Sequence, residues 1–123
     1  GDSNIIDGIM IEDKLVETLG VKFTCVDTGF GTNRPVDVVI RPEDVVLGVT
    51  GKGQLDGVVT NLIFKGVHYE MEVMANGYEW LVQSTVAHQP GEKVGIYVDP
   101  FNIQIMNKPE SDDEKAVPID EYE

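Results

Sequence analysis

Three acidic side chains in the middle of the chain have the types and spacing that could bind a ligand. Glu70 and Glu72 alternate along one predicted strand and Glu79 lies on the next, so all three carboxylates share one face of a predicted sheet. Carboxylates gathered in this way attract cations and repel phosphates and anionic lipids. An ordinary acidic, solvated strand face explains the same pattern, and both interpretations stay open.

The sequence lacks the common nucleotide-binding motifs. Residues 48–53 resemble a phosphate-binding loop, but its leading glycine would fall on Val46, and Lys52 is not followed by Ser or Thr. Gly29-Phe30-Gly31 begins a dinucleotide-binding pattern, but Arg34 stands at the position of its third glycine. We therefore predict no catalytic residue and no cofactor in this chain.

Metal ligands are equally sparse in the sequence. His68 and His88 have no Cys or His partner at ligand spacing, and the acids at 112–114 lack the spacing of a calcium loop. Cys25 is the single cysteine, so an internal disulfide is excluded. Its apolar neighbours are typical of a small buried side chain.

A three-stranded meander must position the acidic side chains. Apolar residues alternate along strands that are separated by Lys65-Gly66 and by Asn76-Gly77, and Asn-Gly favours a tight hairpin turn. The predicted cross-strand pairs are Leu62–Tyr69, Thr60–Met71, Met71–Val82 and Val73–Trp80. Both turns place one apolar set, which includes Val58, on the core side, and the acids lie on the opposite face with His68, Leu81 and Gln83.

A repeat without gaps relates residues 36–47 to residues 94–105. In each copy an alternating strand reaches Pro42 or Pro100, which opens a single helical turn, and the chain then enters another apolar strand. Two units with matching corners predict a closed or nearly closed β-barrel. Tyr97 points away from its apolar neighbours in this pattern and should be exposed.

The overall composition fits one small acidic domain. The chain has 123 residues, a formal net charge of −13 and 41% hydrophobic residues. Residues 107–123 lose periodicity and become strongly acidic, so we predict a disordered tail there. An acidic body disfavours nucleic-acid binding, which needs basic and aromatic residues mixed on one face.

Short segments of the chain resemble a known family. Residues 1–4 with Gly8 resemble the junction that follows the ATPase core in import-type ABC ATP-binding subunits. Residues 38–45, which contain Arg41-Pro42-Glu43-Asp44, resemble a segment of the C-terminal regulatory domain of these subunits, the TOBE domain. Later segments are also similar to that domain, namely 64–66, 90–94 and 98–100. The resemblance covers residues 1 to about 106.

Within this family the chain is most similar to the spermidine/putrescine importer subgroup. The similarity lies in residues 64–70, in Glu79-Trp80 and in Ser84-Thr85. Phe101 departs from the pattern, because the subgroup more often has an acid at that position. A TOBE domain from an importer of another solute, such as a sugar, iron or an oxyanion, therefore stays open as an alternative.

The resemblance implies an all-β, OB-like β-barrel of the TOBE type, with short single-turn helices at Pro42 and Pro100. It divides the chain into a junction over residues 1–8, a barrel over residues 9–106 and the acidic tail over residues 107–123. It also implies a place on the cytoplasmic face of the membrane, in contact with a second copy of the domain and, through the parent subunit, with the transporter's membrane subunits. ATP and Mg would bind in the parent ATPase domain, so this chain should not hydrolyse ATP.

A polyamine importer gives the acidic face a specific candidate ligand. Spermidine is a flexible chain of ammonium groups joined by methylenes, so its site needs spaced carboxylates and an aromatic wall. We predict polyamine contacts by Glu70, Glu72, Glu79 and Tyr97. The alternative for the acidic face is an ordinary solvated surface that binds no ligand. The remote alternative for the whole domain is a free OB-like nucleic-acid-binding module.

Overall fold

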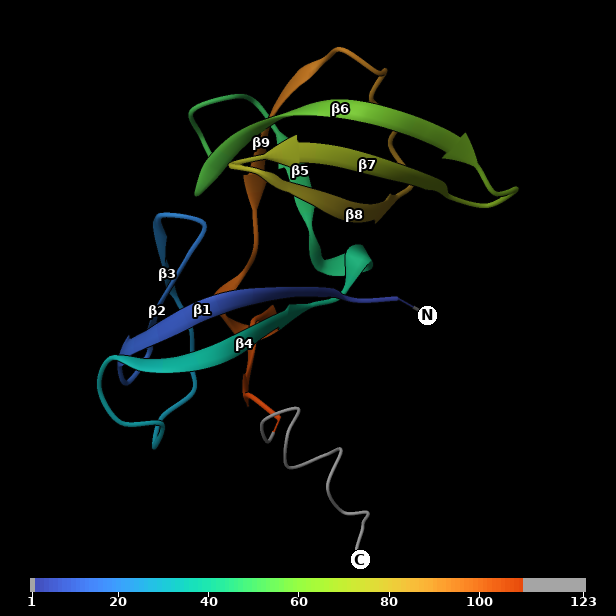
Figure 1. Ribbon diagram of the computed structural model, residues 1–123. Coiled ribbons are helices and arrows are strands. Elements are labelled where there is room, and N and C mark those ends of the chain that lie inside the picture. Colours follow the sequence, from blue (N-terminus) through green and yellow to red (C-terminus); the bar gives the residue numbers. More distant parts are fainter. Residues whose placement is uncertain (1, 110–123) are drawn as a thin grey trace, which may run out of the picture.

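The computed structural model describes residues 2–109, which form two five-stranded antiparallel sheets (Figure 1). Sheet A contains β1 (Asn4–Glu12), β2 (Leu15–Thr18), β3 (Val21–Thr24), β4 (Arg34–Ile40) and β10 (Gln104–Asn107). Sheet B contains β5 (Val46–Gly48), β6 (Leu55–Phe64), β7 (Tyr69–Ala75), β8 (Tyr78–Ser84) and β9 (Lys93–Tyr97). The 3-10 helices η1 (Pro42–Asp44) and η2 (Pro100–Asn102) connect β4 to β5 and β9 to β10. No helix among residues 2–109 is long and apolar enough to cross a membrane.

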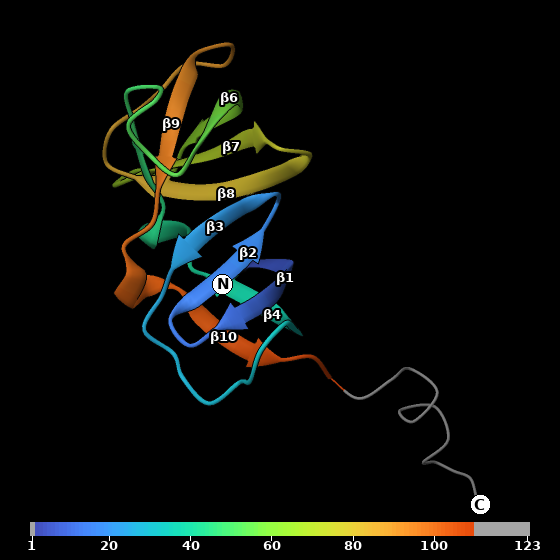
Figure 2. The same cartoon turned by 90° about the vertical axis from the view of Figure 1, so that its left-hand side faces the viewer.

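The predicted repeat is confirmed, and its two copies exchange their last strands. The units β4-η1-β5 and β9-η2-β10 both run strand, single-turn helix, strand. β4 lies in sheet A, but the β5 of its unit pairs with β9 in sheet B (Figure 1). β9 lies in sheet B, but the β10 of its unit pairs with β4 in sheet A (Figure 2). A proline opens each helix, as predicted. The exchange therefore passes the chain between the sheets twice.

The two halves of the chain follow one strand plan. The order β10-β4-β1-β2-β3 in sheet A has the same pattern as β5-β9-β6-β7-β8 in sheet B. Equivalent two-residue turns with positive φ, Leu19-Gly20 and Asn76-Gly77, join β2 to β3 and β7 to β8. These turns meet, because the Asn76 side chain donates a hydrogen bond of 2.9 Å to the Leu19 carbonyl.

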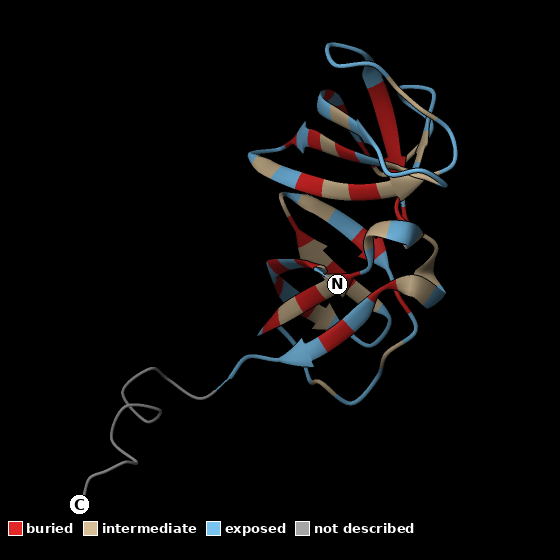
Figure 3. Cartoon of the chain, turned by 90° about the vertical axis from the view of Figure 1, so that its right-hand side faces the viewer, coloured by how far each residue is buried: buried red, intermediate tan, exposed pale blue. Residues whose placement is uncertain are grey.

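One apolar core lies between the inner faces of the two sheets. Buried residues alternate with exposed ones along the strands, as Figure 3 shows. Trp80 is fully buried and makes an edge contact with the Tyr78 ring, with 5.6 Å between ring centroids. Trp80 pairs with Val73, and Met71 pairs with Val82, so both predicted pairs about Asn76-Gly77 are confirmed.

The predicted register of the preceding hairpin is wrong by two residues. Phe64 pairs with Tyr69 and Leu62 pairs with Met71, in place of Leu62–Tyr69 and Thr60–Met71. The reason is the connection, which is a four-residue loop over residues 65–68 and not a two-residue turn. A backbone hydrogen bond of 2.8 Å from the first to the last residue closes this loop.

A β-bulge in β6 changes which residues enter the core. Val59 pairs with Val73, but Asn61 pairs with Glu72, so one residue of β6 is left over between these pairs. Val59 is therefore buried, whereas Val58 and Thr60, which we predicted on the core side, are exposed. Phe64 at the end of the strand is also exposed, at 61%.

The folded region is longer at both ends than the predicted barrel over residues 9–106. β1 begins at Asn4, and residues 4–8 pair with residues 36–40 of β4, so most of the predicted junction is part of sheet A. Asn107 is the last residue of β10 and pairs with Val36 of β4, although we predicted a tail from residue 107. Residues 110–123 of that predicted tail lie outside the described residues.

A lysine bridges two acids on the outer face of sheet A. Asp7 and Asp37 lie directly opposite one another on β1 and β4, an arrangement that is destabilising for like charges. The Lys108 ammonium bonds both carboxylates and lies 2.7 Å from Asp37 Oδ1. These hydrogen bonds, first the one to Asp37 and then the one to Asp7, raise the pKa of Lys108. The contact fixes the chain just beyond β10 to sheet A.

A carboxylate also organises the loop between β8 and β9. His88 Nδ1 lies 2.7 Å from Glu92 Oε2, and the Gln89 backbone N–H donates to Glu92 Oε1 at 3.1 Å. The hydrogen bond with His88, followed by the one from Gln89, holds the pKa of Glu92 below its usual value. The Glu92 backbone accepts a hydrogen bond from Val59, so the loop is also tied to the bulged strand.

Replacing Trp80 with alanine should lower the free energy of unfolding by about 3–5 kcal/mol, because it removes a large side chain from the centre of the core. Phe64→Ala is the control at an exposed aromatic residue, with an expected loss below about 1 kcal/mol. Denaturant unfolding of both variants measures the difference. Losses of equal size would contradict the assignment of Trp80 to the core.

Acidification should remove the stabilisation that Glu92 provides. The pKa of Glu92 is lower in the folded state than in the unfolded state, where it is near 4.5. The stabilisation by Glu92 is therefore present above the unfolded-state pKa and is lost as pH falls through the folded-state pKa. As pH is lowered below 4.5, the free energy of unfolding of Glu92→Gln should therefore fall less than that of the unsubstituted chain. Glu12→Gln is the charge-matched control, and an unchanged pH profile in Glu92→Gln would refute the role of this carboxylate.

Candidate functional site

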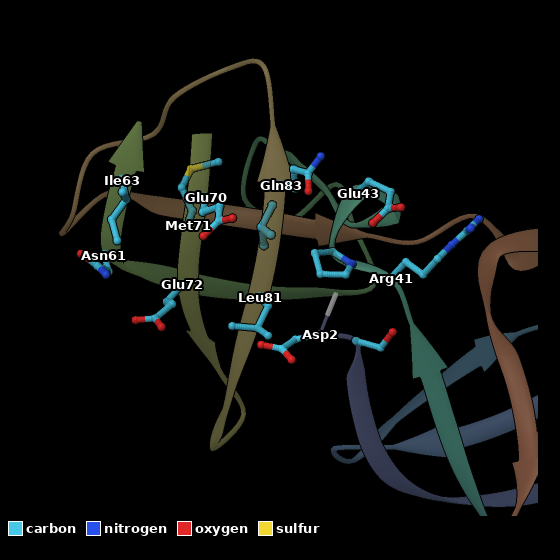
Figure 4. Close-up of a pocket in the computed structure, with 13 residues that line it drawn as sticks. Asp2, Arg41, Glu43, Asn61, Ile63, Glu70, Met71, Glu72, Leu81 and Gln83 are labelled. Carbon is cyan, nitrogen blue, oxygen red and sulfur yellow. The ribbon is translucent and has the colours of Figure 1, made fainter. Parts of the chain in front are cut away.

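A groove of about 530 Å³ lies on the outer face of sheet B (Figure 4). Its floor is formed by β6, β7 and β8, and its walls are formed by the segment before β1 and by the corner at η1. The principal floor residues are Asn61, Ile63, Glu70, Glu72, Leu81 and Gln83, and the wall residues are Asp2, Ser3, Arg41, Pro42 and Glu43.

Cross-strand pairing arranges the floor in two rows. One row runs Ile63-Glu70-Gln83 across the three strands, and the next runs Asn61-Glu72-Leu81. Glu70 and Glu72 are two residues apart on β7, which places their Cα atoms about 6.6–6.8 Å apart on the same face. Each carboxylate therefore lies beside an apolar side chain, Ile63 or Leu81.

The groove is acidic. Its lining contains the carboxylates of Asp2, Glu43, Glu70 and Glu72 and a single basic side chain, Arg41. Arg41 Nε donates to Asp44 Oδ2 at 3.1 Å, and in Figure 4 its side chain extends away from Glu70 and Glu72. The guanidinium is thus directed to another acid and does not pair with the floor carboxylates, whose negative charge attracts cations.

Glu70 lies between two nitrogen-bearing side chains of the β6–β7 hairpin. Lys65 Nζ is 3.9 Å from Glu70 Oε1, and His68 Nε2 is 3.8 Å from Glu70 Oε2. Both Lys65 and Glu70 are about half exposed, so their pairing contributes little to stability. The contact nevertheless places an alkylammonium group beside this carboxylate.

The structure brings together only part of the predicted site. Glu70 and Glu72 both line the groove. Glu79 shares the face but lies one row further along, where Glu79 Oε2 accepts a hydrogen bond of 3.0 Å from Thr60 Oγ1. Tyr97 is 42% exposed, as predicted, but it lies on β9, on the other side of β6 from Glu70 and Glu72.

The walls of the groove were not predictable from the sequence. Arg41 and Glu43 approach the floor because η1 packs against β8, which follows η1 by more than thirty residues. Asp2 joins them from the segment before β1. The Arg41-Pro42-Glu43-Asp44 corner was visible as a turn in the sequence. No local signal indicated that β8 would be its neighbour.

The comparisons with known proteins agree with the fold. The family model described as TOBE domain matches residues 38–106. The chain is 52% identical over 112 residues to the spermidine/putrescine import ATP-binding protein PotA of Acetivibrio thermocellus. This alignment covers 91% of the present chain and 32% of that protein. It is 57% identical over 109 residues to the protein of the same name from Bacteroides thetaiotaomicron, covering 88% of this chain and 24% of that protein.

The chain therefore spans about a quarter to a third of the length of the curated relatives that it matches. A solved structure of the cytoplasmic molybdate-binding protein ModG, with molybdate bound, has a similar fold, with a TM-score of 0.74 at 18% identity. That similarity covers 85% of this chain and 96% of the ModG chain. The predicted all-β, OB-like architecture is confirmed, and the chain belongs to the TOBE domain family.

Proposed function

We propose that the chain is a regulatory and interaction domain in the ATP-binding subunit of an ABC importer for polyamines. The observation that carries this proposal is its identity of 46–57% to import proteins named for spermidine and putrescine, over most of its length. In such a subunit the domain lies at the cytoplasmic face of the membrane and contacts a second copy of itself. ATP binding and hydrolysis belong to the part of the subunit outside this chain.

The acidic groove is the proposed polyamine site. Glu70 and Glu72 supply carboxylates at a spacing similar to that of ammonium groups across a four-carbon chain, and Leu81 and Ile63 offer apolar contacts for the methylenes. Lys65 supports this assignment, because its own alkylammonium group already lies beside Glu70.

The proposal changes the set of contact residues that the sequence suggested. Glu70 and Glu72 remain the principal contacts, and Asp2 and Glu43 are added from the walls. Glu79 remains a neighbouring negative charge one row away. Tyr97 is left out of the contact set because β6 separates its strand from β7.

An oxyanion ligand is the competing proposal, since the structurally similar ModG is named for molybdate binding. The charge of the groove argues against it. Four carboxylates and one guanidinium line the groove, and carboxylates repel an oxyanion. The same acidic lining disfavours a nucleic-acid backbone.

Removing the two floor charges tests the polyamine site. Glu70→Gln combined with Glu72→Gln should weaken spermidine binding about fivefold or more, since each exposed charge pair contributes roughly 0.5 kcal/mol. Isothermal titration calorimetry at low and at physiological salt measures the affinity.

The matched control for that experiment is Glu12→Gln combined with Glu17→Gln, which removes the same charge from sheet A. This control should retain most of the affinity at physiological salt, because screening weakens distant attraction. Equal losses in the two double variants would reduce the effect to general charge attraction. Absence of binding to the parent chain would reject polyamine recognition by this domain.

Replacing Lys65 with methionine should strengthen spermidine binding about two- to fivefold, because the internal ammonium no longer competes for Glu70. Lys93→Met removes the same charge from β9 on the same sheet and is the control. Competition binding with both variants measures the difference. If Lys93→Met raises the affinity as much as Lys65→Met does, Lys65 has no specific role at Glu70.

A further inference from the structure

Asn4 is a buried side chain that joins the two sheets beside the groove. It is fully buried, and its Nδ2 donates to the Ile40 carbonyl at 3.2 Å and to the Leu81 carbonyl at 2.9 Å. Its Oδ1 accepts from the Leu81 backbone N–H at 2.8 Å and from the Tyr78 hydroxyl at 3.2 Å. A carboxamide has two donor and two acceptor positions, and here all four are used.

The partners of Asn4 lead to both walls and to the floor of the groove. Ser3, the residue before Asn4, is in one wall, and Arg41, the residue after Ile40, is in the other. Leu81 lies on the floor. Since β8 is an edge strand, the carboxamide pairs with its outward backbone in the way that another strand would.

Gln54 makes a related contact in the other half of the chain, and this contact stays within one sheet. Gln54 Nε2 donates to the Val98 carbonyl at 2.8 Å, and the Val98 N–H donates to Gln54 Oε1 at 2.9 Å. Val98 precedes the Asp99-Pro100 corner just as Ile40 precedes the Arg41-Pro42 corner. Gln54 therefore offers a matched comparison, because it supports a corner without bridging to the other sheet.

We infer that Asn4 is a positioning residue for the groove: it sets the distance of the two walls from the floor and thereby couples ligand occupancy to the arrangement of the two sheets. The ligand part of this inference rests on the proposed polyamine function. A ligand held between floor and walls stabilises the arrangement that Asn4 bonds. By linkage, loosening this contact lowers the affinity for the ligand.

Amide hydrogen exchange and spermidine titration of Asn4→Ala and Gln54→Ala test this coupling. Asn4→Ala should accelerate exchange of the Leu81 amide on the floor and of the Asp44 amide at the wall, and weaken spermidine binding at least about fivefold. Gln54→Ala should leave exchange at both amides and the affinity close to those of the parent chain. Tyr78→Phe, which removes one hydrogen bond and keeps the ring, should show smaller changes of the same kind and covers the case in which Asn4→Ala does not fold.

The results separate this inference from the proposed function. If the parent chain binds spermidine and Asn4→Ala, or Tyr78→Phe in its place, binds it equally well, the positioning role is overturned and polyamine recognition stands. If the unsubstituted chain binds no spermidine, polyamine recognition fails, and the hydrogen-exchange data alone test the positioning role of Asn4. Faster exchange at Asp44 in Asn4→Ala but not in Gln54→Ala then supports the positioning role, and equal exchange overturns it.

Discussion

The exchange of β5 and β10 between the two sheets is the constraint on which the rest of the structure depends. Each sheet contains four strands from one half of the chain and a fifth strand from the other half. Neither half of the chain can therefore form a complete sheet by itself. The residues that follow the two corners, Val45 and Ile103, are buried in the shared core at aligned positions. Packing of the core and pairing of the exchanged strands therefore stabilise the same arrangement of the two sheets.

The groove is a consequence of this crossing. As the chain leaves β4 for sheet B, the η1 corner passes beside β8 and forms a wall against the face that carries Glu70 and Glu72. The aligned corner in the other half has Asp99 and Phe101 where this corner has Arg41 and Glu43. The two halves thus share a backbone plan while their corners carry different chemistry, and this difference suits a domain with one specialised surface.

Polar contacts fix the relation between sheets that apolar packing alone would leave less defined. Asn4 satisfies its whole hydrogen-bonding capacity between β1, β4 and β8, and Asn76 joins the two equivalent turns. A buried amide with partners for every donor and acceptor favours one arrangement, because any sliding of the sheets would leave polar atoms unpaired. The hydrogen bonds of Asn4 also link the arrangement of the sheets to the walls of the groove.

The sequence by itself determined the features that depend on local geometry. Asn76-Gly77 fixed the register of β7 and β8, and thereby the burial of Trp80 and the position of Glu79 on the face of Glu70 and Glu72, because a two-residue turn leaves only one pairing. Pro42 and Pro100 likewise located both corners. Lys65-Gly66 predicted the wrong register, because a turn dipeptide does not reveal the four-residue loop in which it lies, and no alternation reveals the bulge before Asn61. Only the tertiary structure decided that the last strands are exchanged and that Arg41 and Glu43 line the same groove as Glu70, because the neighbour of each strand depends on long-range packing that residue spacing does not encode.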